Sequence, residues 1–393
     1  MIYLDNSATT RQFDEVTQYM AEIAGAYFGN PSSMHLAGVD AEKIVRDSRE
    51  TIAGILKADP KEIVFTSGGT ESDNLAIAGC AYANRRKGSH IITSRIEHPA
   101  VLETVRHLES EGFKVTYLDV AKDGRVDPGS LREALCSDTI LVSVMHVNNE
   151  IGSVNDIEAL SGIVRSYDPS ILFHTDAVQS FGKLDVLPKK MGVDLVSVSA
   201  HKIHGPKGVG FLYVKNGTKI NPILFGGGQQ NGLRSGTENV PGIAGLALAS
   251  KLSCGSLGEK SQKLFEQKSY FVQELLKLPE VTVNGLTGEK NADNSPSAAG
   301  TAPHIISASF AGVRAEVLLH ALEAKEIYVS SGSACSSNRP AKSATLTAIG
   351  LDEKLLTSTL RFSMSQETTR EEIDATLTVL NDELPKLRRY QRR

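Results

Sequence analysis

Short apolar runs that alternate with amphipathic segments constrain the fold of this 393-residue chain more than any other feature. The runs are rich in Val, Ile and Leu and are bounded by Gly, Asp, Ser or Pro. They cover residues 62–67, 90–94, 114–119, 139–147, 171–176, 194–200 and 208–214. Helical patterns such as 99–111 and 155–167 lie between them. Buried strands alternating with helices predict an α/β domain with a mostly parallel, seven-stranded sheet.

The pattern changes after Gly255, where a helical pattern at 259–278 leads into a loop rich in Asn, Gly, Ser and Pro. The strand-like run "HIISASF" and the helix-like run "AEVLLHALEAK" follow that loop. We therefore predict two domains. A large cofactor-binding α/β domain would cover residues 14–255, and a smaller α+β domain would combine residues 1–13 with 256–393.

Composition argues against several classes of protein. The net charge is −4 and no long basic run occurs, so we expect no direct binding of nucleic acid. The short basic end "KLRRYQRR" is typical of a solvated tail. No apolar run reaches the ~18 residues of a membrane span, and the N-terminus lacks the pattern of a secretory signal. We therefore expect no membrane contact.

The four cysteines, Cys80, Cys136, Cys254 and Cys335, lie far apart and form neither a CxxC pair nor a zinc-binding pattern. A long chain with so few cysteines is typical of a reducing compartment, so we expect a cytoplasmic protein. Cys80 and Cys136 are expected to serve as small apolar side chains. Cys335 differs, because "SSGSACSSNR" surrounds it with small polar residues, which is typical of a reactive thiol.

A glycine-rich turn joins a predicted strand to a predicted helix in "FTSGGTESDNLAIAG". Gly68, Gly69 and Thr70 place free backbone N–H groups at the helix N-terminus, where an anion can bind. Glu71 and Asp73 follow in the first turn, as the helix dipole favours. The same residues also fit an ordinary tight turn, and the motif lacks the lysine of a P-loop and the spacing of a dinucleotide site.

Two further strand ends carry polar groups, at the sheet edge where open α/β sheets bind ligands. Asp176 closes one strand, with Gln179 three residues on, and Ser199, His201 and Lys202 close another. Taken alone, these fit a capping aspartate and a turn lysine. Together with the glycine turn they supply a Schiff-base lysine, an acid for a pyridinium nitrogen and an anion site. Pyridoxal phosphate requires these three groups.

Several motifs along almost the whole chain carry a family resemblance. They read "YLDNSATT", "GNPSSMH", "FTSGGTESDNLAI", "EHPAVL", "MHVNNEIG", "DAVQSFGK", "SAHKIHGPKG", "GGGQQNGLRSGTEN", "SSGSAC" and "LRFSM". In these motifs the chain resembles the cysteine desulfurases, pyridoxal-phosphate enzymes of aminotransferase class V with the type I aminotransferase fold. The "SSGSAC" form resembles the branch that serves iron–sulfur cluster assembly.

The resemblance implies a role for each site residue. Lys202 would form the Schiff base and carry protons, His98 would stack on the ring as an acid/base group, and Cys335 would attack the substrate sulfur. Arg361, beside Asn149, would bind the substrate carboxylate. The residues that would hold the cofactor are Gly69, Thr70, Asn149, Asp176, Gln179, Ser199, His201 and, toward the neighbouring subunit, Thr237. Taken alone, His98 also fits a capping or core histidine, and Arg361 a strand-surface arginine.

The resemblance also implies the reaction. L-Cysteine would become L-alanine, and a persulfide on Cys335 would supply sulfur for iron–sulfur cluster assembly or tRNA thiolation. A homodimer and a sulfur-acceptor protein are the implied partners, and no metal site is expected beyond a transient iron–sulfur ligand at Cys335. The alternatives are selenocysteine or cysteine sulfinate as substrate, a non-catalytic sulfur carrier, and a nucleotide-binding switch.

Three features depart from the family pattern. Asn231 stands where the family usually carries a basic residue, and Phe225 stands where it often carries His. The loop at 286–303 is longer than is typical. We expect these features to affect the rim of the site and partner docking rather than the chemistry.

Overall fold

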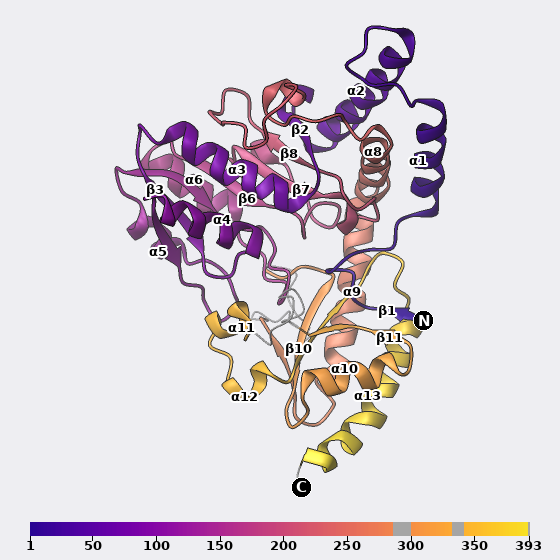
Figure 1. The fold of residues 1–393 in the computed structure, drawn as a ribbon. Helices are drawn as coiled ribbons and strands as arrows, with labels where there is room; N and C mark the ends of the chain where they lie inside the picture. The colour runs from indigo at the N-terminus through magenta and orange to yellow at the C-terminus, as the bar shows by residue number, and fades with distance from the viewer. Residues whose placement is uncertain (286–299, 332–341, 392–393) are drawn as a thin grey trace.

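The computed structural model describes residues 1–285, 300–331 and 342–391. All seven predicted strands are present and form one sheet in the order β2-β8-β7-β6-β5-β3-β4 (Figure 1). They are β2 Ile63–Thr66, β3 His90–Ser94, β4 Lys114–Leu118, β5 Thr139–Ser143, β6 Leu172–Asp176, β7 Leu195–Ser199 and β8 Gly210–Val214. Neighbours run parallel except at β8, which is antiparallel to both β7 and β2. The predicted α/β class is confirmed.

Helices cover both faces of this sheet, as its apolar strands require. Successive strand residues point to opposite faces, so Ile91 belongs to the apolar core that includes α3 and α4, while Ile92 belongs to the core that includes α1, α2, α6 and α8. The helices of this part of the chain are α1 Asp14–Ala26, α2 Leu36–Leu56, α3 Gly69–Asn84, α4 Pro99–Ser110, α5 Pro128–Ala134, α6 Ile157–Tyr167, α7 Pro188–Met191 and α8 Val240–Cys254. Burying one such Ile stabilises the fold by about 1.5–3 kcal/mol.

A second sheet, antiparallel and smaller, has the order β12-β13-β10-β9. Its strands are β9 Val281–Asn284, β10 Ile305–Phe310, β12 Ser330–Ser331 and β13 Thr359–Ser363. The helices of this part are α9 Leu257–Leu275, α10 Ala315–Glu323, α11 Ala344–Ala348, α12 Glu353–Leu356 and α13 Arg370–Gln391. The division into domains at residue 255 stays a prediction.

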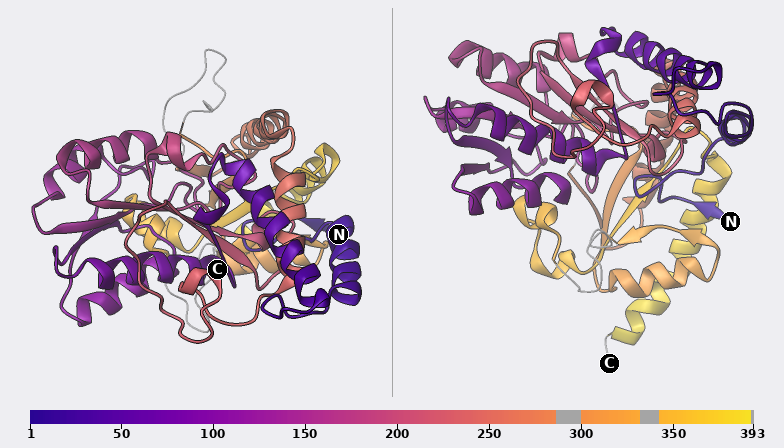
Figure 2. Two further views of the ribbon diagram at one scale, coloured as in Figure 1. Left: turned by 90° about the horizontal axis from the view of Figure 1, so that it is seen from above. Right: turned by 45° about the horizontal axis from the view of Figure 1, so that its top comes forward.

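The start of the chain lies against its C-terminal third. The short β1 (Ile2–Tyr3) pairs in parallel with β11 (Ile327–Tyr328), and Leu4 is fully buried in the core of the smaller sheet. The chain then passes between the two sheets before it enters α1, as the right-hand view in Figure 2 shows. This path brings residues 5–10 to the functional site.

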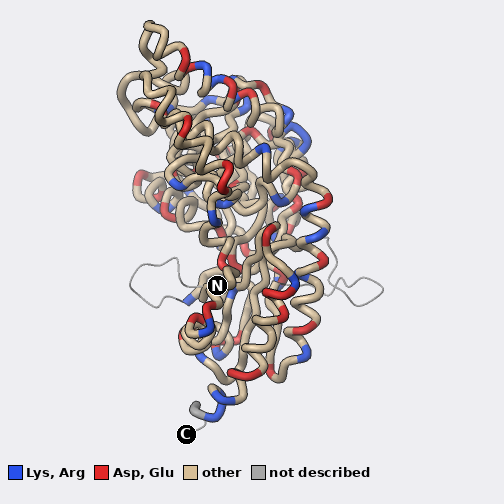
Figure 3. Tube along the Cα trace, turned by 90° about the vertical axis from the view of Figure 1, so that its right-hand side faces the viewer, with Lys and Arg blue, Asp and Glu red and all other residues tan. Residues whose placement is uncertain are grey.

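Among the described residues, no single helix is long and apolar enough to cross a membrane; α8 and α9 reach that length only as a pair bent by 69°. Basic and acidic residues are interspersed along the trace in Figure 3.

One cysteine differs from its expected placement. Cys80 is 1% exposed in the core, as predicted, whereas Cys136 is exposed, so the expectation that it serves as a small apolar core residue is wrong. The turn before β5 holds Cys136 outside the core, because its backbone N–H donates to Thr139 Oγ1 at 3.0 Å. Its Sγ lies 3.3 Å from His90 Nδ1.

Candidate active site

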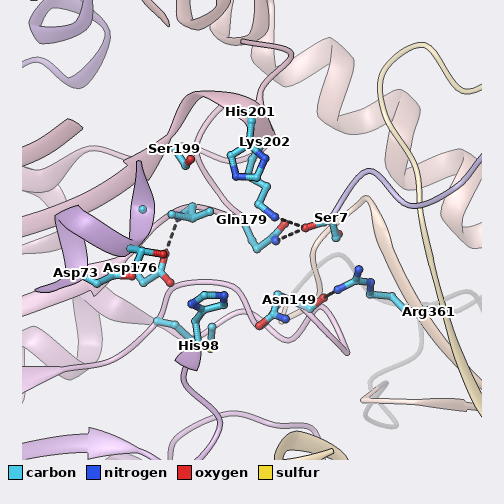
Figure 4. A pocket seen from close by; sticks show the side chains of 14 residues that line it. Ser7, Asp73, His98, Asn149, Asp176, Gln179, Ser199, His201, Lys202 and Arg361 are labelled. Atoms are coloured by element: carbon cyan, nitrogen blue, oxygen red, sulfur yellow. Dashed lines mark hydrogen bonds between the residues drawn. The ribbon is translucent and has the colours of Figure 1, made fainter. Parts of the chain in front are cut away.

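A cavity of about 200 Å³ lies at the carboxyl ends of β6 and β7 (Figure 4). Its lining residues are Ser7, Gly69, Thr70, Asp73, His98, Met145, Asn149, Asp176, Val178, Gln179, Ser199, His201, Lys202 and Arg361. The structure thus brings together every predicted site residue except two. Thr237 is exposed and lies outside this lining, and Cys335 lies outside the described residues.

Asp176 ends β6 and is 5% exposed. One carboxylate oxygen accepts a hydrogen bond from the Val178 amide at 2.8 Å. Burial raises the pKa of Asp176, while the charges of His98 and Lys202 and the Val178 hydrogen bond lower it. The Val178 amide and the positive charge of Lys202 favour the ionised form of Asp176 and so oppose the effect of burial.

Lys202 lies in the 3-10 turn η2 (Ala200–Lys202) that follows β7. Its Nζ donates to the backbone carbonyls of Ser7 and Ala8, both at 2.6 Å. Gln179 Nε2 also donates to the Ser7 carbonyl, at 2.9 Å. The lysine that closes the sheet edge is therefore held by the N-terminal segment, which crosses the pocket (Figure 4).

His201 completes this edge, with its Nδ1 3.1 Å from Thr9 Oγ1. Burial and the neighbouring lysines lower the pKa of His201 to about 4, so its imidazole is neutral near pH 7. Sequence reasoning missed residues 7–9, because contacts through backbone carbonyls leave no side-chain signature. The small polar run "DNSATT" was the available signal.

The glycine turn approaches the opposite wall closely. Gly68 has φ of 148°, which favours glycine, and a Cβ on Gly69 would lie 2.8 Å from Val178 Cγ2. A side chain at position 69 would therefore have to displace Val178, which lines the same pocket. Glu71 accepts a hydrogen bond from the Ser67 amide at 2.8 Å. It also forms an ion pair with Arg234, whose Nε lies 2.8 Å from Glu71 Oε1.

Asp73 departs from the expectation for this turn. It lies beyond the first turn of α3 and is 1% exposed, so it is not a solvated acid that interacts with the helix dipole. It lines the pocket instead, because this face of α3 packs on the sheet.

His98 is both a helix cap and a pocket residue. It is the N-cap of α4, where Nδ1 accepts a hydrogen bond from the Ala100 amide at 3.1 Å. Its ring faces the cavity (Figure 4). Burial lowers the pKa of His98, with Asp176 raising it and Lys202 lowering it further. Since Nδ1 accepts, Nε2 is the ring nitrogen left to exchange a proton.

Arg361, on β13, closes the pocket from the smaller sheet. Its side chain is 4% exposed, so the alternative of a strand-surface arginine is wrong. Nη2 contacts Asp5 Oδ1 at 2.8 Å, and Nη1 donates to the Asn149 carbonyl at 2.8 Å. Its Nε is buried and has no hydrogen-bond partner among the described residues.

The lining therefore suits an anionic ligand that carries a carbonyl and a protonated ring nitrogen. Lys202 and Arg361 bring positive charge from two sides, the start of α3 offers free amides, and Asp176 supplies the acid. No cluster of three or more His, Cys, Asp or Glu suited to a metal ion occurs among the residues that the structure describes.

Comparisons with known proteins agree with this geometry. The sequence model of the family described as Aminotransferase class-V matches residues 2–376. "Cysteine desulfurase IscS" of Dictyoglomus turgidum is 45% identical over 388 residues, covering 98% of this chain and 95% of that protein. The protein of the same name from Methanosarcina thermophila is 43% identical over 387 residues, covering 98% of this chain and 93% of its own length.

Solved structures give the same result for the fold. A structure titled "NifS-like protein" superposes with a TM-score of 0.90 at 37% identity, over 98% of this chain and all of that one. Sequence and structure together define a class-V aminotransferase of fold type I. The chain belongs to this family, and within it to the cysteine desulfurases.

Proposed function

We propose that this protein is a pyridoxal-phosphate-dependent cysteine desulfurase that converts L-cysteine to L-alanine and supplies the sulfur for iron–sulfur cluster assembly. The observation that carries the proposal is one pocket with Asp176 and Lys202 on the sheet edge and Arg361 on the facing side. Both relatives described above are named cysteine desulfurase, which supports the same activity.

The residues present fit pyridoxal phosphate. Lys202 would hold its aldehyde carbon, Asp176 its ring nitrogen and Gln179 its ring oxygen. The phosphate would bind at the start of α3, where a Cβ on Gly69 would fill the space. The residues assigned to that phosphate are Gly69, Thr70, Ser199 and His201. When bound, the cofactor acts as an electron sink for bonds at the amino-acid Cα and Cβ.

The chain's own residues would orient the substrate. Arg361 presents a buried guanidinium whose Nε has no partner among the described residues, so a substrate carboxylate would gain a charge-assisted hydrogen bond there. The Asn149 side chain faces the same space (Figure 4). Asp5 and the Asn149 carbonyl fix the guanidinium plane, so the carboxylate binds in one orientation.

Two groups would move protons. The Lys202 amine is held by two carbonyls, which favour its protonated form and place it within reach of the cavity. His98 is neutral near pH 7 because burial lowers its pKa, and since Nδ1 accepts from the Ala100 amide, its Nε2 carries the ring proton and can donate it. Lys202 and His98 thus place proton-carrying groups on opposite sides of the pocket.

Sulfur transfer would use Cys335. Its thiolate attacks the substrate sulfur, an S–S bond forms, and the Cβ–S bond breaks with its electron pair left on Cβ. A proton then completes the methyl group of alanine, and the persulfide passes its outer sulfur to an acceptor protein. We assign this step from the sequence around Cys335, which lies outside the described residues.

The remaining parts of the proposal concern the assembly. Thr237 is exposed, as required of a residue that reaches the cofactor phosphate of a neighbouring subunit in a homodimer. A cytoplasmic location fits sulfur chemistry that needs reduced thiols. tRNA thiolation is a second destination for the same persulfide.

The test combines absorbance and product analysis. The purified protein should absorb near about 420 nm, as a lysine–pyridoxal Schiff base does, and should release alanine from cysteine. Cys335→Ser should keep that band and lose at least about 99.9% of alanine release, because the nucleophile is gone. Alanine release at the normal rate by Cys335→Ser would contradict the assignment. Assays with selenocysteine and cysteine sulfinate test the alternative substrates.

A further inference from the structure

Behind the pocket wall, a chain of hydrogen bonds crosses three neighbouring strands and ends at Asp73. His174 on β6 bonds to Ser143 Oγ on β5 through Nδ1 at 2.8 Å, and to Ser197 Oγ on β7 through Nε2 at 2.9 Å. Ser197 bonds in turn to the carboxyl group of Asp73 on α3. Ser143, His174 and Ser197 are fully buried, and Asp73 is 1% exposed.

Asp73 lacks a positively charged partner that would hold it as an anion. Among the described residues, the one basic group within ion-pair distance of Asp73 is His174, whose Nε2 lies 3.6 Å from Asp73 Oδ1. Burial lowers the pKa of His174 to about 3, so this imidazole is neutral near pH 7. Asp73 Oδ1 has no hydrogen-bond partner within the described part of the chain. A buried carboxyl in such surroundings binds a proton instead of remaining charged.

The neighbouring carboxylate of Asp176 acts in the same direction. Burial raises the pKa of Asp73 and the negative charge of Asp176 raises it further, whereas the side-chain hydrogen bond with Ser197 lowers it. Asp176 has what Asp73 lacks, namely the Val178 amide and the positive charge of Lys202. Because two buried carboxylates on one wall repel each other, Asp176 keeps the charge and Asp73 keeps the proton.

We propose that Asp73 is a protonated carboxylic acid in the folded protein, a positioning residue that leaves Asp176 as the charged carboxylate facing the ring site. The effect on Asp176 and the cofactor ring rests on the proposed function, whereas the protonation of Asp73 does not. Figure 4 shows both side chains on the same wall of the pocket.

The direction of the hydrogen bonds follows from this proton. With that proton, Asp73 would donate to Ser197 Oγ, the Ser197 hydroxyl would donate to His174 Nε2, and His174 Nδ1–H would donate to Ser143 Oγ. If Asp73 were ionised, the chain would reverse, and His174 would carry its proton on Nε2. The tautomer of His174 therefore reports the proton on Asp73.

The first test is the thermal stability of the full chain without cofactor. In the unfolded chain an aspartate ionises at about pH 4. If Asp73 keeps its proton in the folded protein, the free energy of unfolding of the wild type falls as the pH rises above that value. Asp73→Asn is neutral throughout and its amide can donate to Ser197. It should melt about 2 °C or more above the wild type at about pH 7.5, with no difference at about pH 4.

A matched control is Asp194→Asn. Asp194 is 4% exposed, but it is ion-paired with Arg165 and accepts from the Phe173 amide at 2.8 Å. Its removal should lower the melting temperature at the same pH. A melting temperature below that of the wild type for Asp73→Asn at about pH 7.5 would overturn the proposal.

Two further measurements decide the matter if a variant fails to fold. Nitrogen-15 NMR of the wild-type imidazoles should show His174 protonated on Nδ1 near pH 7, and an Nε2 proton would contradict the proposal. In the cofactor-loaded protein, Asp73→Asn should leave the pH midpoint of the visible band within about 0.3 units of the wild type, and a fall of about one unit would mean that Asp73 is charged. Lack of a visible band in every protein would count against the proposed function, while the melting and NMR results still decide on Asp73.

Discussion

The two sides of the pocket are built in different ways. On one side, Asp176 and Lys202 follow β6 and β7 directly, so the strands place them at the edge of the large sheet. On the other side, Arg361 pairs with Asp5, a residue 356 positions away. The position of Asp176 and Lys202 is set by the large sheet alone. The position of Arg361 is set by the contact of the smaller sheet and the start of the chain with the large sheet. We therefore expect changes on the sheet side to alter the bound cofactor, and changes on the other side to alter substrate affinity.

The strongest test of the sheet side is Lys202→Ala. Loss of the amine removes both the covalent attachment and a proton donor, so alanine release should fall by at least about 1,000-fold and the visible band should change. Lys207→Ala, an exposed lysine of the same motif, is the control and should retain activity. An unchanged absorption spectrum in Lys202→Ala would refute the role given to this lysine.

Arg361→Lys tests the other side. Lysine keeps the positive charge but loses the planar fork, so we expect KM for cysteine to rise by about 10- to 100-fold. The visible band should stay as in the wild type, because the sheet side is untouched. A changed band with an unchanged KM would show that the two sides are not separate in the way described.

Gly69→Ala should have a smaller effect. The added Cβ would lie 2.8 Å from Val178 Cγ2 in the space assigned to the phosphate. Cofactor titration should give a dissociation constant about 10-fold higher. Gly25→Ala is a matched control, because a Cβ there has no neighbour within 4 Å. Equal dissociation constants for Gly69→Ala and the wild type would place the phosphate elsewhere.

The smallest effect concerns Glu97, which precedes His98. Its Oε1 accepts from the Met145 amide at 3.0 Å, and burial raises the pKa of Glu97 to about 8. Because the folded pKa exceeds the unfolded one, the stability from the neutral acid is present below about pH 4.5 and is lost as the pH rises toward 8. Glu97→Gln should reduce this loss, so its melting temperature should fall less than that of the wild type between about pH 5 and pH 8. An equal fall in both proteins would show that Glu97 is ionised throughout.

The two sides also differ in how much of them the sequence could predict. Strand alternation located all seven strands of the large sheet, and the polar residues at their ends lie in the pocket. The sequence left open whether Arg361 is buried, since burial depends on the pairing of β13 with β10 and β12. It did not indicate Ser7, whose contact is a carbonyl, or the burial of Asp73, which needs the packing of α3 on the sheet. The role predicted for Thr237 would need a second copy of the chain.

The central claim is that Lys202 holds the cofactor in this pocket, and one measurement tests it most directly. Borohydride reduction of the yellow protein fixes the cofactor on its lysine, and peptide mass spectrometry then locates it. We expect the added mass on the peptide that contains Lys202. Lys183 is the informative competitor, because it is buried, its pKa is lowered to about 7, and its Nζ donates to the Lys202 carbonyl at 2.8 Å. Added mass on Lys183, or on no lysine, would contradict the account.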